Sequence, residues 1–249
     1  MALAEEGHQV YGTSRDPSTV DLEGVAFKAL TLDVNDAKSV EACVRRILEE
    51  NGRLDVVVNN AGFSYGGAVE DTSVEETKML FETNVFGILR VCHAVLPIMR
   101  AQRQGLIVNV SSIAGRIGAP YQGVYSASKF AVEGLTETLR MEVKRFGIDV
   151  VLIEPGDIST TPNRRHTAAS QSRELYRDQY AMTLAKIEAD ERGGTPAEAV
   201  ARLLRQIVNQ EAPRLRYMVG PLHQKLAVWA KCFLPAKLFE WGMMKTYKL

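Results

Sequence analysis

The sequence predicts a doubly wound α/β fold, in which a parallel sheet carries helices on both of its faces. Three observations lead to this fold class. Short apolar runs alternate several times with stretches of helical periodicity along the 249 residues. The runs are rich in valine and isoleucine and lack polar alternation, as strands buried on both faces do. Glycine, asparagine or proline follows most of them. Alternation of this kind implies right-handed crossovers within one parallel sheet.

In the first half of the chain, each apolar run leads into a turn or a helical pattern. Runs of β-branched residues predict strands, and apolar residues three or four positions apart predict helices. The strands expected here are Gln9–Thr13, Ala29–Leu32 and Leu54–Val58, and the helices are Asn35–Glu50 and Ser73–Gln102.

The second half repeats this alternation. The strands expected are Leu106–Val110, Ile148–Glu154 and Arg216–Val219, and the helices are Val124–Phe146 and a helix through Val208 with Thr195 as N-cap and Pro196 as first helical residue. Residues 157–194 are polar and patchily periodic, and we expect helical pieces that form a lid. Residues 221–249 should be a helical extension of a single domain that covers residues 1–249.

Composition argues against several classes of function. Thirty basic and thirty acidic side chains cancel, so no basic field is present to attract nucleic acid. Cys43, Cys92 and Cys232 are far apart and the four histidines are scattered, which argues against a disulfide framework and a metal site. No signal-peptide pattern and no run of 18 apolar residues occurs, so we expect a cytoplasmic protein.

Polar and glycine-rich residues follow the predicted strands. These positions are Arg15, Asp33, Asn60–Gly62, Ser111-Ser112 and Pro155-Gly156. In parallel α/β sheets, ligands bind beyond the carboxyl ends of the strands. The site is therefore expected at this edge of the sheet.

Tyr125 and Lys129 form the clearest chemical pair. They stand four residues apart in a predicted helix, so both side chains lie on one face. An ammonium group beside a phenol favours the phenolate and eases proton transfer near neutral pH. Without further context, the pair could equally be a surface tyrosine stacked on a lysine stem.

Ser112 and Asn84 supply that context. Ser112 follows a predicted strand, and its hydroxyl could donate to a substrate oxygen that Tyr125 protonates, although turns and helix caps also favour serine. Asn84 stands among apolar residues in the middle of a helix. That position is unfavourable for asparagine unless its amide makes a specific bond.

With these residues, the sequence resembles the short-chain dehydrogenases/reductases. The matching pieces, in order, are Asn59-Asn60-Ala61-Gly62, Thr83-Asn84-Val85, Ser111-Ser112, Tyr125-Ser126-Ala127-Ser128-Lys129 and Pro155-Gly156-Asp157-Ile158-Ser159-Thr160. Each piece is weak alone, but five in register identify the family. The resemblance implies a Rossmann-like domain that interconverts an alcohol and a carbonyl with a nicotinamide cofactor.

The resemblance also implies a role for each matching residue. Tyr125 is the proton donor or acceptor, and Lys129 lowers the pKa of that phenol and binds the nicotinamide ribose. Ser112 polarises the substrate oxygen, so Ser112 and Tyr125 contact the substrate, and Asn84 holds a relay water beside Lys129. The other cofactor contacts divide by position. On the adenosine side they are Asp33 and Val34 at the adenine, with Asn60, Ala61 and Gly62 beside them; at the nicotinamide they are Pro155, Gly156, Ile158 and Thr160.

Arg15 bears on the choice between the two nicotinamide cofactors. In these folds an acidic residue after the second strand binds the ribose 2′-hydroxyl, whereas an arginine accommodates a 2′-phosphate. No acidic residue stands between the strand and Arg15, although Asp16 follows it. A guanidinium group suits bidentate phosphate binding. We therefore expect NADP(H) in preference to NAD(H).

The start of the sequence departs from the family pattern. The family opens with a strand and a Thr-Gly-x-x-x-Gly-x-Gly turn that holds the pyrophosphate, and no such turn precedes Arg15. The sheet is therefore expected to lack its first strand. Two interpretations remain: the sequence is a truncated part of an ordinary reductase, or the chain binds cofactor poorly and acts as a pseudoenzyme or binding scaffold.

The local sequence around Tyr125 and Arg15 is similar to that of the hydroxysteroid and retinol dehydrogenase branch. This similarity implies that the substrate is a lipophilic alcohol or ketone. The pocket should lie between Ser112, Tyr125, the lid and the tail. The aromatic and basic tail could pack over this pocket, form a subunit interface or touch a membrane surface. Many relatives pair through the helices that correspond to Ser73–Gln102 and Val124–Phe146, so we expect a homodimer or homotetramer.

Overall fold

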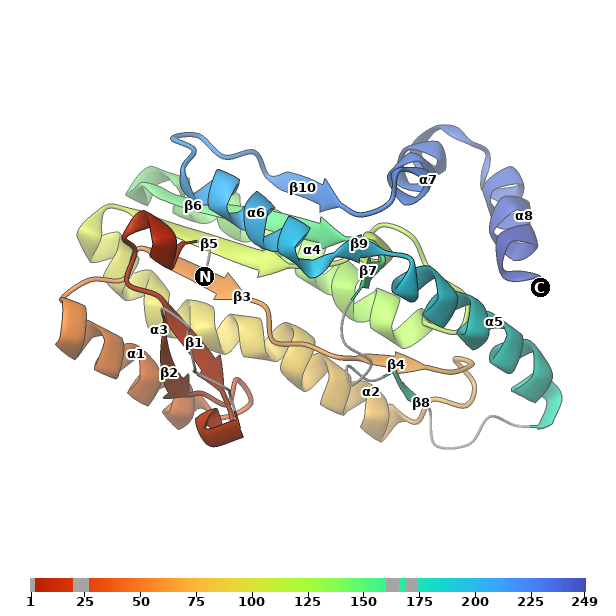
Figure 1. Cartoon of the computed structure of the whole chain (residues 1–249), viewed down its shortest axis with the longest axis horizontal. Coiled ribbons are helices and arrows are strands. Elements are labelled where there is room, and N and C mark those ends of the chain that lie inside the picture. Colours follow the sequence, from red (N-terminus) through yellow and green to blue (C-terminus); the bar gives the residue numbers. More distant parts are fainter. Residues whose placement is uncertain (1–2, 20–26, 160–165, 169–173) are drawn as a thin grey trace.

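Helices cover both faces of a parallel sheet in the computed structural model, which describes residues 3–19, 27–159, 166–168 and 174–249 (Figure 1). The strands are β1 (Tyr11–Ser14), β2 (Lys28–Thr31), β3 (Val56–Asn59), β4 (Ser64–Gly66), β5 (Gly105–Val110), β6 (Ile148–Pro155), β7 (Ile158–Ser159), β8 (His166–Ala168), β9 (Thr195–Pro196) and β10 (Arg216–Val219). The α-helices are α1 (Ala37–Asn51), α2 (Val74–Phe81), α3 (Gly87–Gln102), α4 (Gly123–Val143), α5 (Glu174–Arg192), α6 (Ala197–Val208), α7 (Leu222–Phe233) and α8 (Ala236–Tyr247).

The remaining elements are four short 3₁₀ segments and one π-helix. The 3₁₀ segments are η1 (Ala4–Glu6), η2 (Pro17–Thr19), η4 (Ile113–Gly115) and η5 (Lys144–Phe146), and the π-helix is η3 (Glu82–Phe86). All the strand pairs described are parallel. The predicted fold class is confirmed.

The main sheet has the strand order β10-β6-β5-β3, and its two faces are buried by different helices. Side chains of β5 alternate between the faces. Ile107 joins a core with residues of α1, α3 and α4, whereas Leu106 and Val108 join a second core with residues of α6 and β10. Burial on both faces explains why these strands read as unbroken apolar runs.

The sheet is interrupted between β1 and β3. Strand β1 pairs with β2 in a separate two-stranded sheet, and β3 pairs with β5. A cavity of about 740 Å³ separates the facing edges and is lined by β1, β3, α1 and α3. Val58 of β3 is 38% exposed there, which is unusual for valine in the middle of a sheet. The gap agrees with the expectation of a strand lacking at this place.

The long helix expected at Ser73–Gln102 is present but contains the π-helix η3. Ser73 and Glu76 form a reciprocal capping box at its start. The described part of the chain has one helix long and apolar enough to cross a membrane, and it is this one, with a mean hydropathy of 1.4 over its most apolar window. Its buried residues, Val91, Val95 and Met99 among them, belong to the core beside the sheet, which accounts for that hydropathy.

Two local expectations need correction. Thr195 is not the N-cap of the following helix, because it pairs with Ile158 of β7 in an extended backbone. Pro196 is the N-cap residue instead, and α6 begins at Ala197. The second correction concerns residues 157–194, expected as several helical pieces. Their described part contains β7, β8 and one 19-residue helix, α5.

Candidate active site

Ser112, Tyr125 and the end of β6 meet at the carboxyl edge of the sheet. Tyr125 lies in the first turn of α4, whose N-cap is Gln122. Ser112 directly follows β5, and its Oγ lies 3.4 Å from the Pro155 carbonyl oxygen, to which it donates a hydrogen bond. The same Oγ accepts from the Ala114 amide at 3.1 Å, which caps η4. The cap expected as an alternative role for Ser112 thus coexists with the position expected for catalysis.

The environment of the Tyr125 phenol favours its protonated form. Burial raises the pKa of Tyr125, and a hydrogen bond with Ser112 opposes that rise. The ammonium of Lys129 lies 5.8 Å from the centre of the Tyr125 ring. The resemblance implies a lowered pKa, but burial of the phenol outweighs the opposing contacts.

Lys129 is a buried cation one turn further along α4. Its side chain is 6% exposed, and Nζ donates to the Val110 carbonyl oxygen at 2.9 Å. Burial lowers the pKa of Lys129 to about 8, against an opposing effect of the Glu133 carboxylate. A desolvated ammonium held at the end of β5 can bind hydroxyl groups and stabilise a phenolate.

Asn84 sits in the π-helix, where an extra residue per turn directs its side chain to the loop after β3. Its Nδ2 donates to the Phe63 carbonyl oxygen at 2.9 Å and to Ser128 Oγ at 3.2 Å. Its Oδ1 accepts from the Phe63 amide at 3.0 Å. The amide therefore clamps this loop to α4. The relay water that the resemblance implies stays a prediction.

Gly62 lies between Asn84 and Lys129. A Cβ atom at this position would lie 3.0 Å from Asn84 Oδ1 and 3.8 Å from Lys129 Nζ. Asn60, Ala61 and Gly62 are all exposed at the end of β3. The absence of a side chain at Gly62 thus keeps the approach to the Lys129 ammonium open, which fits the ribose of a nicotinamide cofactor.

A buried polar ladder holds α4 to the sheet, and the sequence pattern did not single it out. Asn59 Nδ2 donates to Asn109 Oδ1 at 2.8 Å, and Asn109 Nδ2 donates to Thr136 Oγ1 at 2.9 Å. Asn59 and Asn109 are direct register partners of β3 and β5. Because buried amides must be bonded, this ladder fixes the position of the helix that carries Tyr125 and Lys129.

A buried charge cluster lies behind the site and was also missed. Glu154 of β6 is fully buried and forms ion pairs with Arg116 at 3.3 Å and Arg216 at 3.1 Å. Arg216 also pairs with Glu133, one helical turn after Lys129, at 3.0 Å. Burial raises the pKa of Glu154, and the neighbouring Glu133 carboxylate adds to the rise. The cluster ties η4, α4 and β10 together just below the candidate site.

Three of the residues expected on the adenosine side, Arg15, Asp33 and Val34, follow β1 and β2, which are neighbours in their sheet. Asn60–Gly62, expected on the same side, follow β3. Arg15 is exposed directly after β1. The Asp33 carboxylate accepts from the Asn35 amide at 2.9 Å. The Val34 side chain packs on α3, where a Cβ at Gly87 would lie 2.9 Å from it. Thr13, Val34, Asn60 and Ala61 line the end of the cavity between the sheets.

The nicotinamide side is expected after β6. Pro155 ends β6, and Gly156 lies against Gly220, where a Cβ atom would lie 3.0 Å from the Cα atom of Gly156. Ile158 belongs to β7. Thr160 lies outside the described residues. The ammonium of Lys129 and the phenol of Tyr125, both near the carboxyl edge of the sheet, thus fit the ribose and nicotinamide part of the cofactor.

The described residues contain no glycine-rich turn equivalent to the one that holds the cofactor pyrophosphate in the family. Gly7 adopts a left-handed conformation with φ 88, but it precedes β1 and lies at the opposite, amino edge of the sheet. This agrees with the departure from the family pattern expected from the sequence.

Comparisons with known proteins point to one family. A family profile described as short chain dehydrogenase matches residues 1–171. A 3-ketodihydrosphingosine reductase of Bacteroides thetaiotaomicron is 43% identical over 250 residues, covering 99% of this chain and 91% of that protein. A short-chain dehydrogenase from Streptomyces avermitilis has a similar structure, with a TM-score of 0.83, 32% identity and coverage of 98% of this chain and 90% of that one. A short-chain dehydrogenase/reductase from Burkholderia phymatum in complex with NAD is also similar, with a TM-score of 0.75, 25% identity and coverage of 97% and 90%.

Proposed function

Because the chain belongs to the short-chain dehydrogenase/reductase family, we propose that it reduces the ketone of a long-chain lipid with NADP(H). The observation that carries this proposal is the placement of Ser112, Tyr125 and Lys129 at one edge of the sheet. A phenol whose pKa is raised stays protonated at neutral pH, so Tyr125 can donate its proton to the substrate oxygen. When bound, the reduced nicotinamide supplies the hydride for this reaction.

Each of the three residues has a distinct task in the proposed reaction. Ser112 donates a hydrogen bond to the ketone oxygen and so draws negative charge toward it. Tyr125 transfers its proton to that oxygen as the alcohol forms. Lys129 keeps a positive charge 5.8 Å from the ring, which stabilises the phenolate that is left behind.

The substrate class rests on the Bacteroides relative. Its identity of 43% extends over 99% of this chain, including the helices that follow the site. This supports a long-chain 3-keto amino alcohol as substrate, which is a more specific choice than a general lipophilic ketone.

A chain-length series tests the substrate. We expect the purified protein to oxidise NADPH with 3-ketodihydrosphingosine and to lose kcat/KM as the alkyl chain of the substrate is shortened. Each buried CH₂ contributes about 0.8 kcal/mol, so removing four should lower kcat/KM by about two hundredfold. Equal rates across the series would contradict a lipid substrate. Absence of both turnover and NADPH binding would favour a binding protein on the same fold.

Arg15 supports NADP(H) over NAD(H). It is exposed directly after β1, while the Asp16 carboxylate accepts from the Ser18 amide at 3.0 Å and so takes part in a local turn. We expect Arg15→Asp to raise the KM for NADPH by about ten- to a hundredfold, the effect of losing a charge-assisted hydrogen bond. The KM for NADH in the same variant is the internal control and should not rise. An unchanged KM for NADPH would exclude this role of Arg15.

We also propose that two copies associate through α2–α3 and α4. These helices carry exposed apolar side chains, including Met79, Phe86 and Met141. Such residues on otherwise core-forming helices favour a contact with a second copy.

A further inference from the structure

Helix α7 exposes its apolar face to solvent and packs on the protein through the opposite face. Its exposed apolar side chains recur every three or four residues and form one stripe: Leu222, Leu226, Trp229 and Phe233. The opposite face, which contains Gln224, Val228 and Lys231, contacts the body of the protein. An ordinary surface helix turns its apolar stripe inward. The apolar stripe of α7 therefore does not contribute to the core of this domain and is available to a partner outside it.

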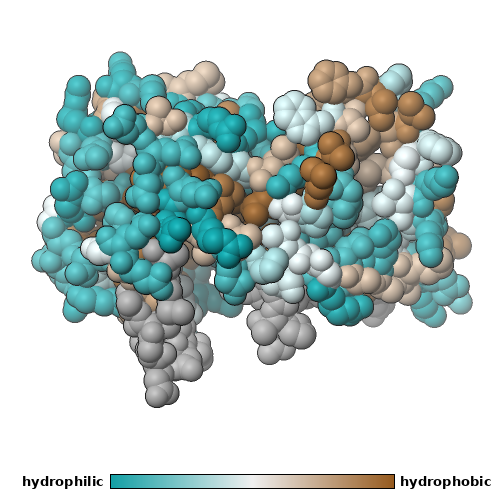
Figure 2. All heavy atoms as spheres, turned by 45° about the horizontal axis from the view of Figure 1, so that its top comes forward, coloured by the Kyte–Doolittle hydropathy of each residue, from teal (hydrophilic) through white to brown (hydrophobic). Residues whose placement is uncertain are grey.

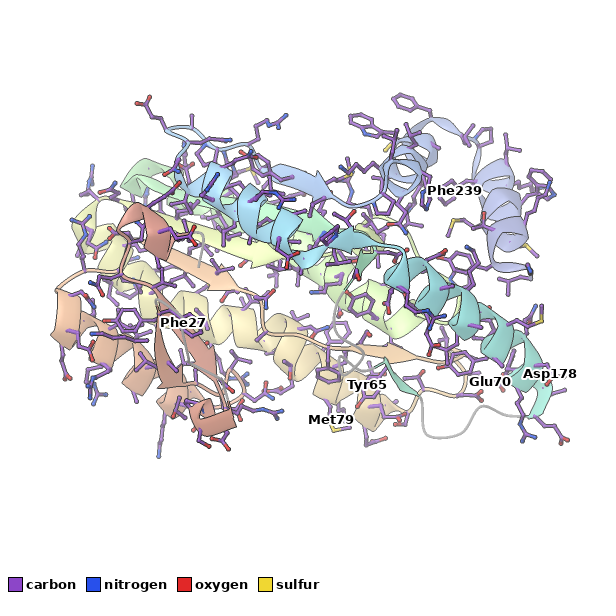
Figure 3. The ribbon with its side chains drawn as sticks, in the orientation of Figure 1. Phe27, Tyr65, Glu70, Met79, Asp178 and Phe239 are labelled. Atoms are coloured by element: carbon purple, nitrogen blue, oxygen red, sulfur yellow. The ribbon has the colours of Figure 1, made fainter. Side chains whose placement is uncertain are left out.

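Helix α8 also exposes apolar side chains, although its inner face is apolar as well. Phe239, Met243 and Tyr247 share its partly buried face, and Phe239 lies between the two helices (Figure 3). Its exposed apolar residues are Leu238, Trp241 and Met244. Figure 2 shows hydrophobic side chains gathered over the end of the molecule that these helices form.

The composition of this surface is distinctive. Nine of the eighteen large apolar side chains exposed in the described part of the chain belong to residues 222–249. Both tryptophans of the protein are among them, Trp229 at 57% and Trp241 at 59% exposure. Residues 221–249 also contain five lysines against one glutamate, in a chain whose total charge is zero.

We propose that α7 and α8 form an interfacial helix pair that binds the surface of an anionic membrane. Exposed tryptophans and leucines flanked by lysines are typical of helices that lie in the headgroup region, where indole rings prefer the interface and lysines meet anionic lipids. A contact between two copies fits less well. Lysine is depleted in protein interfaces, and a twofold contact would bring two surfaces of the same positive charge together.

The helix pair is joined to the candidate active site by short contacts. Gln224 accepts from the Asp157 amide at 2.9 Å, beside the loop that follows β6. Lys231 donates to the Arg116 carbonyl oxygen at 2.6 Å, directly after η4 and Ser112. Membrane docking would therefore hold these loops beside the lipid surface. A benefit for capture of a lipid substrate rests on the proposed function, whereas docking itself does not.

Vesicle co-sedimentation tests the docking without any need for turnover. The protein should sediment with vesicles of phosphatidylglycerol and phosphatidylcholine and bind vesicles of phosphatidylcholine alone much more weakly. High salt should reduce binding to the anionic vesicles, because salt screens the lysines. Leu226→Glu should weaken partitioning by about tenfold or more, since it places a charge in the apolar stripe. Leu175→Glu is the matched control at an exposed leucine on α5 and should bind like the wild type.

Tryptophan fluorescence provides a second measurement confined to the helix pair. Because both tryptophans lie there, their emission should shift to shorter wavelength when anionic vesicles are added. Iodide quenching should fall at the same time. Unchanged emission and no sedimentation would overturn the proposal. So would a dimer that dissociates in Leu226→Glu, measured by light scattering without lipid, because the stripe would then be a contact between copies. Leu226 is exposed, so circular dichroism should show both variants folded.

Discussion

Tyr125→Phe is expected to lower kcat for ketone reduction by about a hundred- to ten-thousandfold, the usual contribution of a positioned general acid. The substitution removes the hydroxyl that bonds Ser112 and leaves the ring near the Lys129 ammonium. The KM for NADPH should change little, because Lys129 and the exposed ends of the strands remain. Stopped-flow measurement of NADPH oxidation at saturating substrate separates the chemical step from binding.

A matched control makes this result specific. Tyr176 also has a hydrogen-bonded hydroxyl, which donates to Glu70 on the surface at 2.8 Å, and Tyr176→Phe should keep full activity. The wild-type rate of reduction should stay level through neutral pH, because the pKa of Tyr125 is raised and the acid remains protonated there. A kcat of Tyr125→Phe within a few fold of the wild type would assign proton transfer to another group.

The parts of the fold that could be predicted are those set by local periodicity. Strand β10 was predicted at its observed bounds, and β5 and β6 differ by a single residue, because apolar runs between turns specify buried strands. The spacing of Tyr125 and Lys129 likewise specifies one helical face without knowledge of the rest of the molecule. Thr195 was misplaced because its strand pairing depends on Ile158, which is distant in the sequence.

The parts of the site that could not be predicted depend on distant partners. Asn59, Asn109 and Thr136 join only after β3, β5 and α4 have packed. The apolar spacing around Asn84 predicts a continuous α-helix, whereas the structure has a π-helix there. Periodicity also showed that the tail is apolar on one side but not which side faces the protein. In α7, the hydrogen bonds of Gln224 and Lys231 decide that orientation.

Lys129→Met is expected to abolish turnover and at the same time to stabilise the fold at pH 7. The methionine keeps most of the stem of the side chain and removes a buried charge. Burial lowers the pKa of Lys129 from an ordinary 10.5 to about 8, and each pKa unit corresponds to about 1.4 kcal/mol. The buried ammonium thus costs the folded state about 3 kcal/mol at pH 7. Removing the ammonium should therefore stabilise the variant, but loss of the hydrogen bond to the Val110 carbonyl oxygen offsets about 1 kcal/mol of that stabilisation.

The direction of the pH dependence follows from the lowered pKa. Below pH 8 the lysine is charged in both the folded and the unfolded chain, so the cost of burial is present in full. As the pH rises from 8 toward 10.5, the folded lysine is neutral while the unfolded one still binds a proton. The stability of the wild type relative to Lys129→Met therefore recovers over this range. Urea unfolding should show that the free energy of unfolding of the variant exceeds that of the wild type by about 2 kcal/mol at pH 7. At pH 10 this difference should disappear. A variant that is less stable than the wild type at pH 7 would mean that the ammonium holds the fold together. The alternative, loss of activity with gain of stability, is typical of a residue kept for catalysis at a cost to the fold.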